Sequence, residues 1–138
     1  INFKGLSNKL DTFLKLKHPR KLILVRSCEN QGNLSGTVSG WTDVKLTDHG
    51  RRQAFMLNQA IEPHLPNISK VYSSDLARCV DTSFYALGFP TNEDIIKQKK
   101  ALRELHFGDH EGLHFDSLSP AEKDQFRSFD YKGPGVDG

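Results

Sequence analysis

The sequence predicts an α/β domain built on a mostly parallel sheet with helices on both faces. Short apolar runs alternate with amphipathic helical stretches, and this order is typical of parallel sheets. The chain has 138 residues, of which 36% are hydrophobic and 26% are charged. That is the size of one domain, and it suffices to bury a core without disulfide staples.

The first strand and the first long helix are predicted from local patterns. Residues 22–25, Leu-Ile-Leu-Val, have the composition of a short, fully buried strand. Thr47 is a good N-cap for the helix that follows. Pro63 and Pro66 are expected to close that helix. Its apolar face is predicted to carry Ala54, Leu57, Ala60 and Ile61.

The remaining elements continue the alternation. Residues 71–72 predict a second strand that runs into Ser73-Ser74, and residues 75–87 predict a helix capped by Asp75. A short helix is expected near residues 93–96, followed by a strand end at residues 101–102. The Ser-Pro pair at 119–120 predicts the start of the last helix, because proline suits the first helical turn.

Residues 1–21 form a separate segment ahead of the domain at residues 22–138. Six basic residues accompany the single acidic residue Asp11, and the apolar residues recur at helical spacing. The segment predicts an amphipathic surface helix. A docking helix and the mature N-terminus of a mitochondrial protein remain open alternatives. The mitochondrial interpretation rests on the acid-poor composition and the start at Ile1, and the cytoplasm is the alternative compartment.

Composition excludes several functional classes. The formal net charge is +2, which is too small to predict nucleic-acid binding. No apolar run reaches the ~18 residues of a membrane span. Two cysteines do not make a disulfide framework. We expect neither a metal nor a cofactor. His106, His110 and His114 have helical spacing, but the intervening glycines would break such a helix.

Polar residues follow the predicted strands at their carboxyl ends, where open α/β sheets bind ligands. Arg26 follows the first strand, Arg78 lies just after the second, and Arg103 follows the third. Three guanidinium groups near one edge favour an anionic ligand.

Five blocks of sequence, in the right order, resemble the histidine phosphatase superfamily, and among its branches the cofactor-dependent phosphoglycerate mutases. The blocks are LVRSCE at 24–29, SGWTDVKLT at 39–47, YSSDLAR at 72–78, LRELHFG at 102–108 and RSFDYKGP at 127–134. The resemblance implies a phosphoglycerate mutase-like fold and a phosphoryl-transfer site. It also implies that the C-terminal part of the fold, with the second catalytic histidine, is missing from this chain.

The resemblance assigns roles to individual residues. Glu104 matches the family's general acid/base, and Ser27 stands at the position of its nucleophilic histidine. The residues that match, or lie beside, its phosphate- and substrate-binding positions are Arg26, Asn33, Ser39, Gly40, Arg78, Arg103 and Arg127.

The departures from the family predict that catalysis has been lost. A serine without an adjacent base cannot carry a phosphoryl group as imidazole does, and Cys28 replaces a glycine beside it. Phenylalanine stands at three polar positions of the family's site, namely 107, 115 and 126. Three hypotheses follow, in this order: a structural or interaction subunit with protein partners, a sensor that binds a phosphate ester, and an active enzyme with an unconventional nucleophile such as Cys28. The several distant changes favour a natural loss over an engineered substitution.

Overall fold

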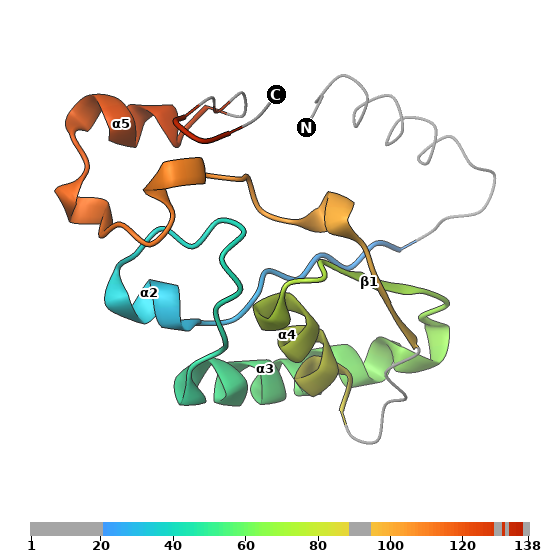
Figure 1. Cartoon of the computed structure of the whole chain (residues 1–138). Helices are drawn as coiled ribbons and strands as arrows, with labels where there is room; N and C mark the ends of the chain where they lie inside the picture. The colour runs from blue at the N-terminus through green and yellow to red at the C-terminus, as the bar shows by residue number, and fades with distance from the viewer. Residues whose placement is uncertain (1–20, 89–94, 129–130, 132, 137–138) are drawn as a thin grey trace.

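The structure is a computed structural model that describes residues 21–88, 95–128, 131 and 133–136. Figure 1 shows its elements in space. The α-helices and strands are α2 (Gln31–Ser35), α3 (Asp48–Ile61), β1 (Val71–Ser73), α4 (Ala77–Leu87), β2 (Ile96–Gln98) and α5 (Pro120–Gln125). The 3₁₀ turns are η1 (Glu62–Asn67), η3 (Lys100–Leu102), η4 (Gly108–His110) and η5 (Phe115–Ser117). The predicted helix at residues 1–21 lies, apart from Lys21, outside the described residues.

The predicted parallel sheet is represented by β1 and β2. They pair in parallel, with Val71 opposite Ile96 and Ser73 opposite Gln98. Two strands with a helix between them form the βαβ unit that alternating patterns predict. Helix α4 makes this crossover and packs against α3, as the lower half of Figure 1 shows.

A small apolar core holds these helices and strands together. Its most buried hydrophobic side chains in this half are Ala54, Ile61, Leu76, Ala86 and Ile96. Of the predicted face of α3, Ala54 and Ile61 are therefore buried, whereas Leu57 is half-buried and Ala60 is exposed. Short side chains at 54 and 86 allow the two helices to approach closely.

Two helices begin where the sequence predicts. The Thr47 side chain accepts a hydrogen bond from the Gly50 N–H at 2.9 Å. Ser119 and Glu122 form a reciprocal capping box at the start of α5. Both motifs satisfy N–H groups that have no partner within the helix. The two prolines after α3 lie within η1, so α3 ends at Ile61 as expected.

The predicted buried strand at residues 22–25 is wrong in two respects. The segment forms no strand, and its four side chains are exposed, from 37% at Ile23 to 84% at Leu24. Its composition suits a strand covered on both faces, but the residues that the structure describes supply neither a paired neighbour nor a cover. Apolar composition alone cannot provide those contacts.

Two smaller predictions also fail. Residues 101–102 belong to the 3₁₀ turn η3 instead of a strand end. Ile96, expected in a short helix, begins β2, and residues 93–94 of that expected helix lie outside the described part. The strand expected to end at residues 101–102 is therefore β2, which begins about five residues earlier, at Ile96. Within the described residues, no helix is long and apolar enough to cross a bilayer.

Candidate functional site

The carboxyl end of β1 leads directly into the site. Ser73 and Ser74 are buried there, and the Ser74 hydroxyl accepts the Leu76 N–H at 3.3 Å. Helix α4 then begins, and its first N–H, at Ala77, donates to the carboxylate of Asp43 at 2.7 Å. Asp75, predicted to cap this helix, does not do so. The cap comes instead from a loop 34 residues earlier in the chain, which no local pattern could indicate.

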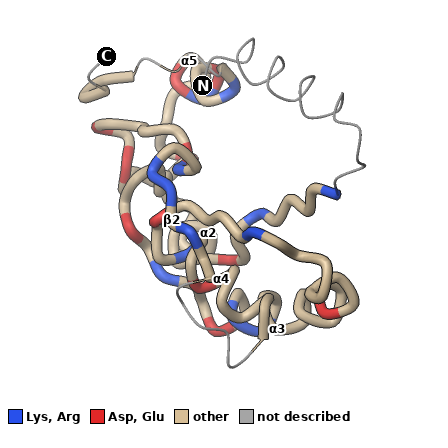
Figure 2. Tube along the Cα trace, turned by 90° about the vertical axis from the view of Figure 1, so that its right-hand side faces the viewer, with Lys and Arg blue, Asp and Glu red and all other residues tan. Residues whose placement is uncertain are grey.

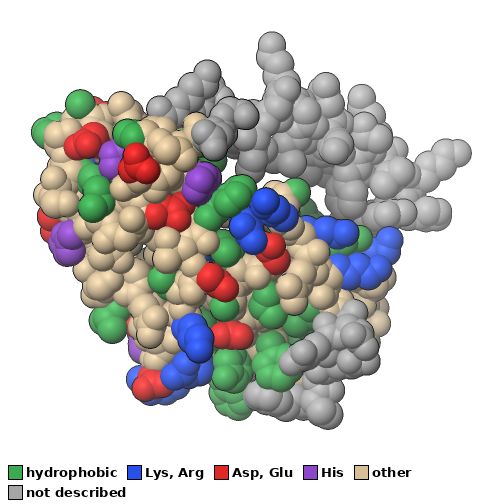
Figure 3. Space-filling view, in the orientation of Figure 1, with side chains coloured by type: hydrophobic (Ala, Val, Ile, Leu, Met, Phe, Trp, Pro, Cys, Tyr) green, Lys and Arg blue, Asp and Glu red, His purple; other side chains and the backbone are tan. Residues whose placement is uncertain are grey.

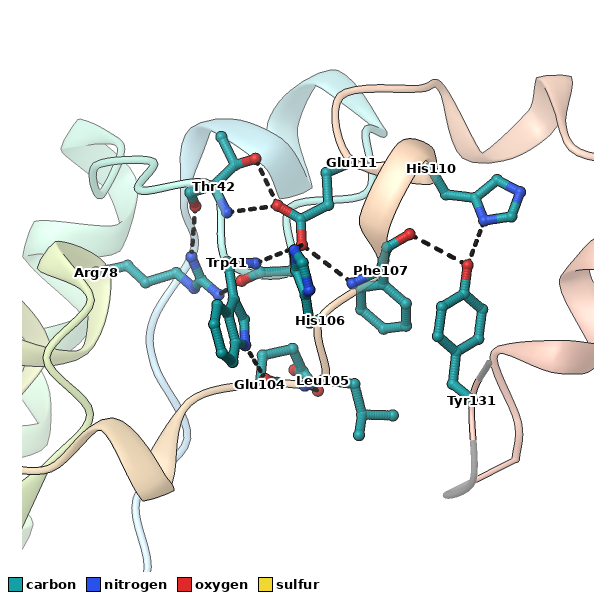
Figure 4. Close-up of polar contacts among 11 residues, drawn as sticks. Trp41, Thr42, Arg78, Glu104, Leu105, His106, Phe107, His110, Glu111 and Tyr131 are labelled. Atoms are coloured by element: carbon teal, nitrogen blue, oxygen red, sulfur yellow. Dashed lines mark hydrogen bonds and ion pairs between the residues drawn. The ribbon is translucent and has the colours of Figure 1, made fainter. Parts of the chain in front are cut away.

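Arg78, from the first turn of α4, is buried with 5% of its surface exposed. Its guanidinium donates to the carbonyl of Gly40 at 2.6 Å and to the carbonyl of Thr42 at 3.0 Å. Figure 4 shows the arginine reaching across to the loop at residues 40–42. Both terminal nitrogens therefore hold this loop.

Glu111 holds the same loop from the other side. Its carboxylate accepts hydrogen bonds from the N–H groups of Trp41, Thr42 and Phe107 and from the Thr42 hydroxyl, at 2.8–3.0 Å. Burial alone would raise the pKa of Glu111, but the hydrogen bonds from Trp41, Phe107 and Thr42 together lower it. The carboxylate is therefore an internal anion in a cradle of donors.

Gly40 makes this close approach possible. Its φ is +50°, and a Cβ placed there would lie 2.2 Å from the Glu111 carboxylate. Only glycine tolerates both the left-handed backbone and the contact. The 36–44 loop also contacts the segment after η4, because the Val38 N–H donates to the Leu113 carbonyl at 2.9 Å.

Trp41 lies between cationic and aromatic neighbours. The Lys100 ammonium and the Arg103 guanidinium lie 4.8 and 4.9 Å from its ring centroid. The His106 ring stacks on it at 4.6 Å. The indole N–H donates to the Glu104 carbonyl at 2.8 Å. Trp41 thus joins the 40–42 loop to the segment that carries Glu104.

Arg103 is engaged by Asp75. Its Nε and Nη2 donate to the two carboxylate oxygens at 2.6 and 2.7 Å, the fork-to-fork geometry of a bidentate ion pair. The hydrogen bond from Arg103 lowers the pKa of the Asp75 carboxyl, and the same bond raises the pKa of the arginine. The arginine predicted to meet a ligand is therefore neutralised within the chain.

Arg26 and Ser27 follow the 22–25 segment. Arg26 is exposed, and no other residue that the structure describes pairs with its guanidinium. Ser27 is half-buried, and its hydroxyl and that of Ser74 oppose the effect of burial on the pKa of the Cys79 thiol. Burial raises the pKa of Cys79 and also that of Cys28, so both side chains are thiols at neutral pH.

The remaining predicted residues are spread over the surface. The Glu104 carboxylate is exposed and accepts the Leu105 N–H at 3.1 Å. Asn33 closes the capping box of α2 with Asn30. Ser39 accepts the Thr42 N–H at its carbonyl, at 2.8 Å. Arg127 is 84% exposed and pairs with Asp124. The contact with Asp124 does not join Arg127 to Arg78 or to Glu104.

An aromatic cluster closes one side of the site. Phe107 packs on Phe126 and on Tyr131, with ring centroids 4.6 and 5.2 Å apart, and Phe115 borders Phe126 at 6.0 Å. The Tyr131 hydroxyl donates to the Phe107 carbonyl and also contacts the buried His110 ring. On its other side, His110 contacts Glu122 of α5 at 3.2 Å. This cluster fixes α5 to η4.

The three histidines at helical spacing are not on one helix. His106 stacks on Trp41, His110 lies in the aromatic cluster, and His114 accepts the Asp116 N–H at 3.2 Å. In the described part of the chain, no group of three potential ligands could hold a metal ion.

Sequence reasoning missed Glu111, Asp75 and Tyr131 as site residues. Glu111 carries a detectable signal, because a carboxylate flanked by Gly108 and Gly112 in a tight turn is placed to accept N–H groups. The Asp75–Arg103 pair joins residues 28 positions apart, so no spacing rule applies to it. Tyr131 reaches Phe107 across 24 residues.

Known proteins are similar to this chain in sequence and in fold. The chain is 31% identical over 124 residues to a 2,3-bisphosphoglycerate-dependent phosphoglycerate mutase of Lactobacillus acidophilus, covering 85% of this chain and 54% of the mutase. It is similar in structure to a phosphoglycerate mutase of Thermus thermophilus, with a TM-score of 0.62, 34% identity and coverage of 80% and 59%. A phosphoserine phosphatase of Entamoeba histolytica matches with a TM-score of 0.62, 28% identity and coverage of 80% and 55%.

These matches include both mutases and phosphatases, and they confirm the predicted phosphoglycerate mutase-like α/β fold. The chain spans about half the length of the relatives that it matches. The model of the histidine phosphatase superfamily (branch 1) matches residues 22–137, the same part of the chain that carries the βαβ unit and the site. The chain therefore belongs to the histidine phosphatase superfamily.

Proposed function

We propose that this chain is a non-catalytic member of the superfamily that serves as a structural or interaction subunit of a larger protein assembly. The observation that carries the proposal is Ser27, which stands where the resemblance places the nucleophilic histidine. Its hydroxyl acts to lower the pKa of the Cys79 thiol, but burial raises that pKa overall. A serine becomes a nucleophile only when a base takes its proton, and a neutral thiol is no such base.

The arginines support the same proposal. Arg78 is bound to two backbone carbonyls, and Arg103 is bound to Asp75 through two hydrogen bonds. A phosphoryl group needs free N–H donors aimed at its oxygens. Of the three arginines predicted at the sheet edge, Arg26 alone is exposed and without a described partner. One exposed cation is weak support for tight binding of a phosphate ester.

The aromatic cluster is a third support. Phe107 and Phe126 stand at polar positions of the family's site, and in this chain they pack on each other and on Tyr131. Aromatic contact of this kind stabilises a packed layer and offers no hydrogen bond to a substrate. The residues that would bind substrate are thus used for internal packing.

A cysteine nucleophile is disfavoured. The reactive form of cysteine is the thiolate, which requires a lowered pKa. Burial raises the pKa of Cys28, and it also raises that of Cys79 against the opposing effect of Arg78. At neutral pH neither thiol is activated.

A phosphate-ester sensor remains the second candidate, and the exposed guanidinium of Arg26 favours it. Calorimetry with 3-phosphoglycerate and phosphoserine at low salt distinguishes the candidates. A structural subunit gives no heat at millimolar ligand, whereas a sensor gives saturable binding that Arg26→Ala abolishes.

Turnover of the full-length protein tests the loss of catalysis. The substrates are 2- and 3-phosphoglycerate, phosphoserine and an aryl phosphate, and a phosphoglycerate mutase relative serves as the positive control. We expect no turnover above background, because losing a covalent nucleophile costs about a millionfold in kcat in another enzyme family. Turnover that survives Ser27→Ala but is lost in Arg26→Ala would contradict the proposal and establish an unconventional nucleophile.

The mitochondrion is the proposed compartment, on the acid-poor composition of residues 1–21. N-terminal sequencing of the native protein tests this proposal. A processed terminus near Ile1 supports it, and an initiator Met just upstream contradicts it.

A further inference from the structure

His110 is a buried titratable side chain that the proposed function does not use. It lies in η4 with 4% of its surface exposed. Its Nδ1 contacts the Tyr131 hydroxyl, and its Nε2 lies 3.2 Å from the Glu122 carboxylate on α5. Figure 4 shows the Tyr131 hydroxyl between the His110 ring and the Phe107 carbonyl. One imidazole therefore connects η4 to two later segments of the chain.

The hydrogen bonds around this ring fix its protonation state. The Tyr131 hydroxyl has one proton, which it donates to the Phe107 carbonyl at 3.1 Å. Its oxygen therefore accepts a hydrogen bond from His110, so Nδ1 carries a proton. An ionised carboxylate is an acceptor only, so the contact with Glu122 requires a proton on Nε2 as well. Only the imidazolium ion has a proton on both nitrogens.

Glu122 supplies the negative charge that a buried imidazolium ion needs. Hydrogen bonds from the Ser119 hydroxyl and N–H, and then one from His110, lower the pKa of Glu122 to about 2. The carboxylate is therefore ionised at neutral pH. The ammonium of its neighbour Lys123 lies over the Phe115 ring, 5.4 Å from the centroid. Pairing and hydrogen bonding offset the cost of burying the charge.

Two further carboxylates flank His110 in the chain, Asp109 and Glu111. Burial is the largest cause that raises the pKa of Tyr131, and the charges of Glu122, Asp109 and Glu111 raise it further. Negative potential therefore converges on the hydroxyl that His110 contacts, and nearby negative charge favours a protonated imidazole. Figure 2 shows acidic positions on α5 and along the chain below it. Figure 3 shows histidine and acidic side chains close together over α5 and the neighbouring turns.

We propose that His110, Glu122 and Tyr131 form a pH-sensitive latch, which holds α5 and Tyr131 on η4 while the imidazole is charged. Loss of one proton leaves the ring a single N–H donor for its two partners. The charge of histidine changes between about pH 5 and 8, so the latch stabilises the attachment at lower pH and weakens as the pH rises. Phe126 ends α5 and packs on Phe107. Release of α5 therefore separates this aromatic pair.

Nitrogen-15 NMR of the histidine rings in the full-length protein tests the protonation state. We expect protons on both ring nitrogens of His110 at pH 6 and on one nitrogen at pH 9. His110→Gln identifies the signals, which disappear in that variant. The competing assignment turns the Tyr131 proton toward Nδ1 and leaves the Phe107 carbonyl to the His110 N–H, at 3.1 Å. An unprotonated ring nitrogen at pH 6, or no change between the two pH values, would overturn the latch.

Hydrogen exchange in the same full-length protein tests the attachment of α5. After correction for the chemical exchange rate, we expect amides of α5 to exchange at least ~10-fold faster at pH 9 than at pH 6, while those of α3 keep their protection. His114→Gln is the matched control, because the His114 side chain is 52% exposed, and it should retain this response. Glu122→Gln removes the anionic partner and should lose it. Equal protection of α5 at both pH values in the native chain, or a full response in Glu122→Gln, would overturn the latch.

Discussion

Arg78 and Glu111 hold the 40–42 loop between them. The guanidinium binds two of its carbonyls, and the carboxylate binds two of its N–H groups. Figure 4 shows the two side chains reaching the loop from different segments. A loop whose donors and acceptors are both satisfied internally is rigid, and it offers few groups to a ligand.

Replacing Arg78 should destabilise the fold. We expect Arg78→Ala to lower the free energy of unfolding by about 2–4 kcal/mol, because two charge-assisted hydrogen bonds are lost from a buried position. Urea unfolding measures the change. Arg127→Ala is the control, since Arg127 is 84% exposed and should change stability by about 0.5 kcal/mol or less. Equal effects at the two positions would contradict the structural role of Arg78.

Replacing Glu111 should also destabilise the fold, because its carboxylate holds the other side of the same loop. Glu111→Ala leaves the N–H groups of Trp41, Thr42 and Phe107 without their acceptor. We expect a loss of about 2–3 kcal/mol in the free energy of unfolding, together with a change in Trp41 fluorescence. Asp116→Ala removes a carboxylate that is 83% exposed and should leave both signals unchanged. An unaltered Trp41 fluorescence signal in Glu111→Ala would show that the Glu111 carboxylate does not hold the loop.

At the scale of elements, α5 is fixed by Glu122. Its carboxylate closes the capping box with Ser119 and contacts His110. The hydrogen bonds from the Ser119 hydroxyl and N–H, followed by that of His110, lower the pKa of Glu122 to about 2. The helix is thereby joined to η4 and to the aromatic cluster.

The lowered pKa of Glu122 fixes the sign of a pH dependence. A carboxyl whose pKa is lower in the folded state stabilises the fold above its unfolded pKa, ~4.3, and loses that contribution as the pH falls through about 2. We expect Glu122→Gln to have a lower melting temperature than the native chain at pH 6, with the difference shrinking between pH 4 and 2. Thermal unfolding at several pH values measures it. A difference that is constant from pH 6 to 2 would contradict the assignment.

Elements were predictable where their signals are local. Thr47 and Ser119 act within three residues of themselves, so the starts of α3 and α5 follow from sequence. The Asp75–Arg103 pair and the Asp43 cap of α4 join residues 28 and 34 positions apart. Such pairs depend on the tertiary fold. The prediction that residues 22–25 are buried failed because burial of a strand depends on the neighbours it receives.

The site was predicted in part. Arg78, which follows β1 in the chain, donates a hydrogen bond to the carbonyl of Gly40, and the resemblance assigns both residues to phosphate- or substrate-binding positions. What the sequence could not indicate is that Arg78 and Arg103 are bonded to groups of the same chain. Arginines in a motif predict an anionic ligand, but the tertiary structure decides whether they bind a ligand, an internal carboxylate as Arg103 does, or backbone carbonyls as Arg78 does.

At the scale of the whole molecule, the chain covers about half the length of its relatives. It also exposes the 22–25 segment, which has the composition of a buried strand. Exposed apolar surface of this kind is characteristic of a region that further polypeptide covers, either of the same protein or of a partner.

The size of the endogenous protein, measured by native gel electrophoresis or gel filtration with mass spectrometry, tests the central claim most directly. We expect the endogenous polypeptide in a particle many times its own mass, with no free pool that turns over phosphate esters. Migration as a monomer or small oligomer that binds or hydrolyses phosphoglycerates would contradict the claim.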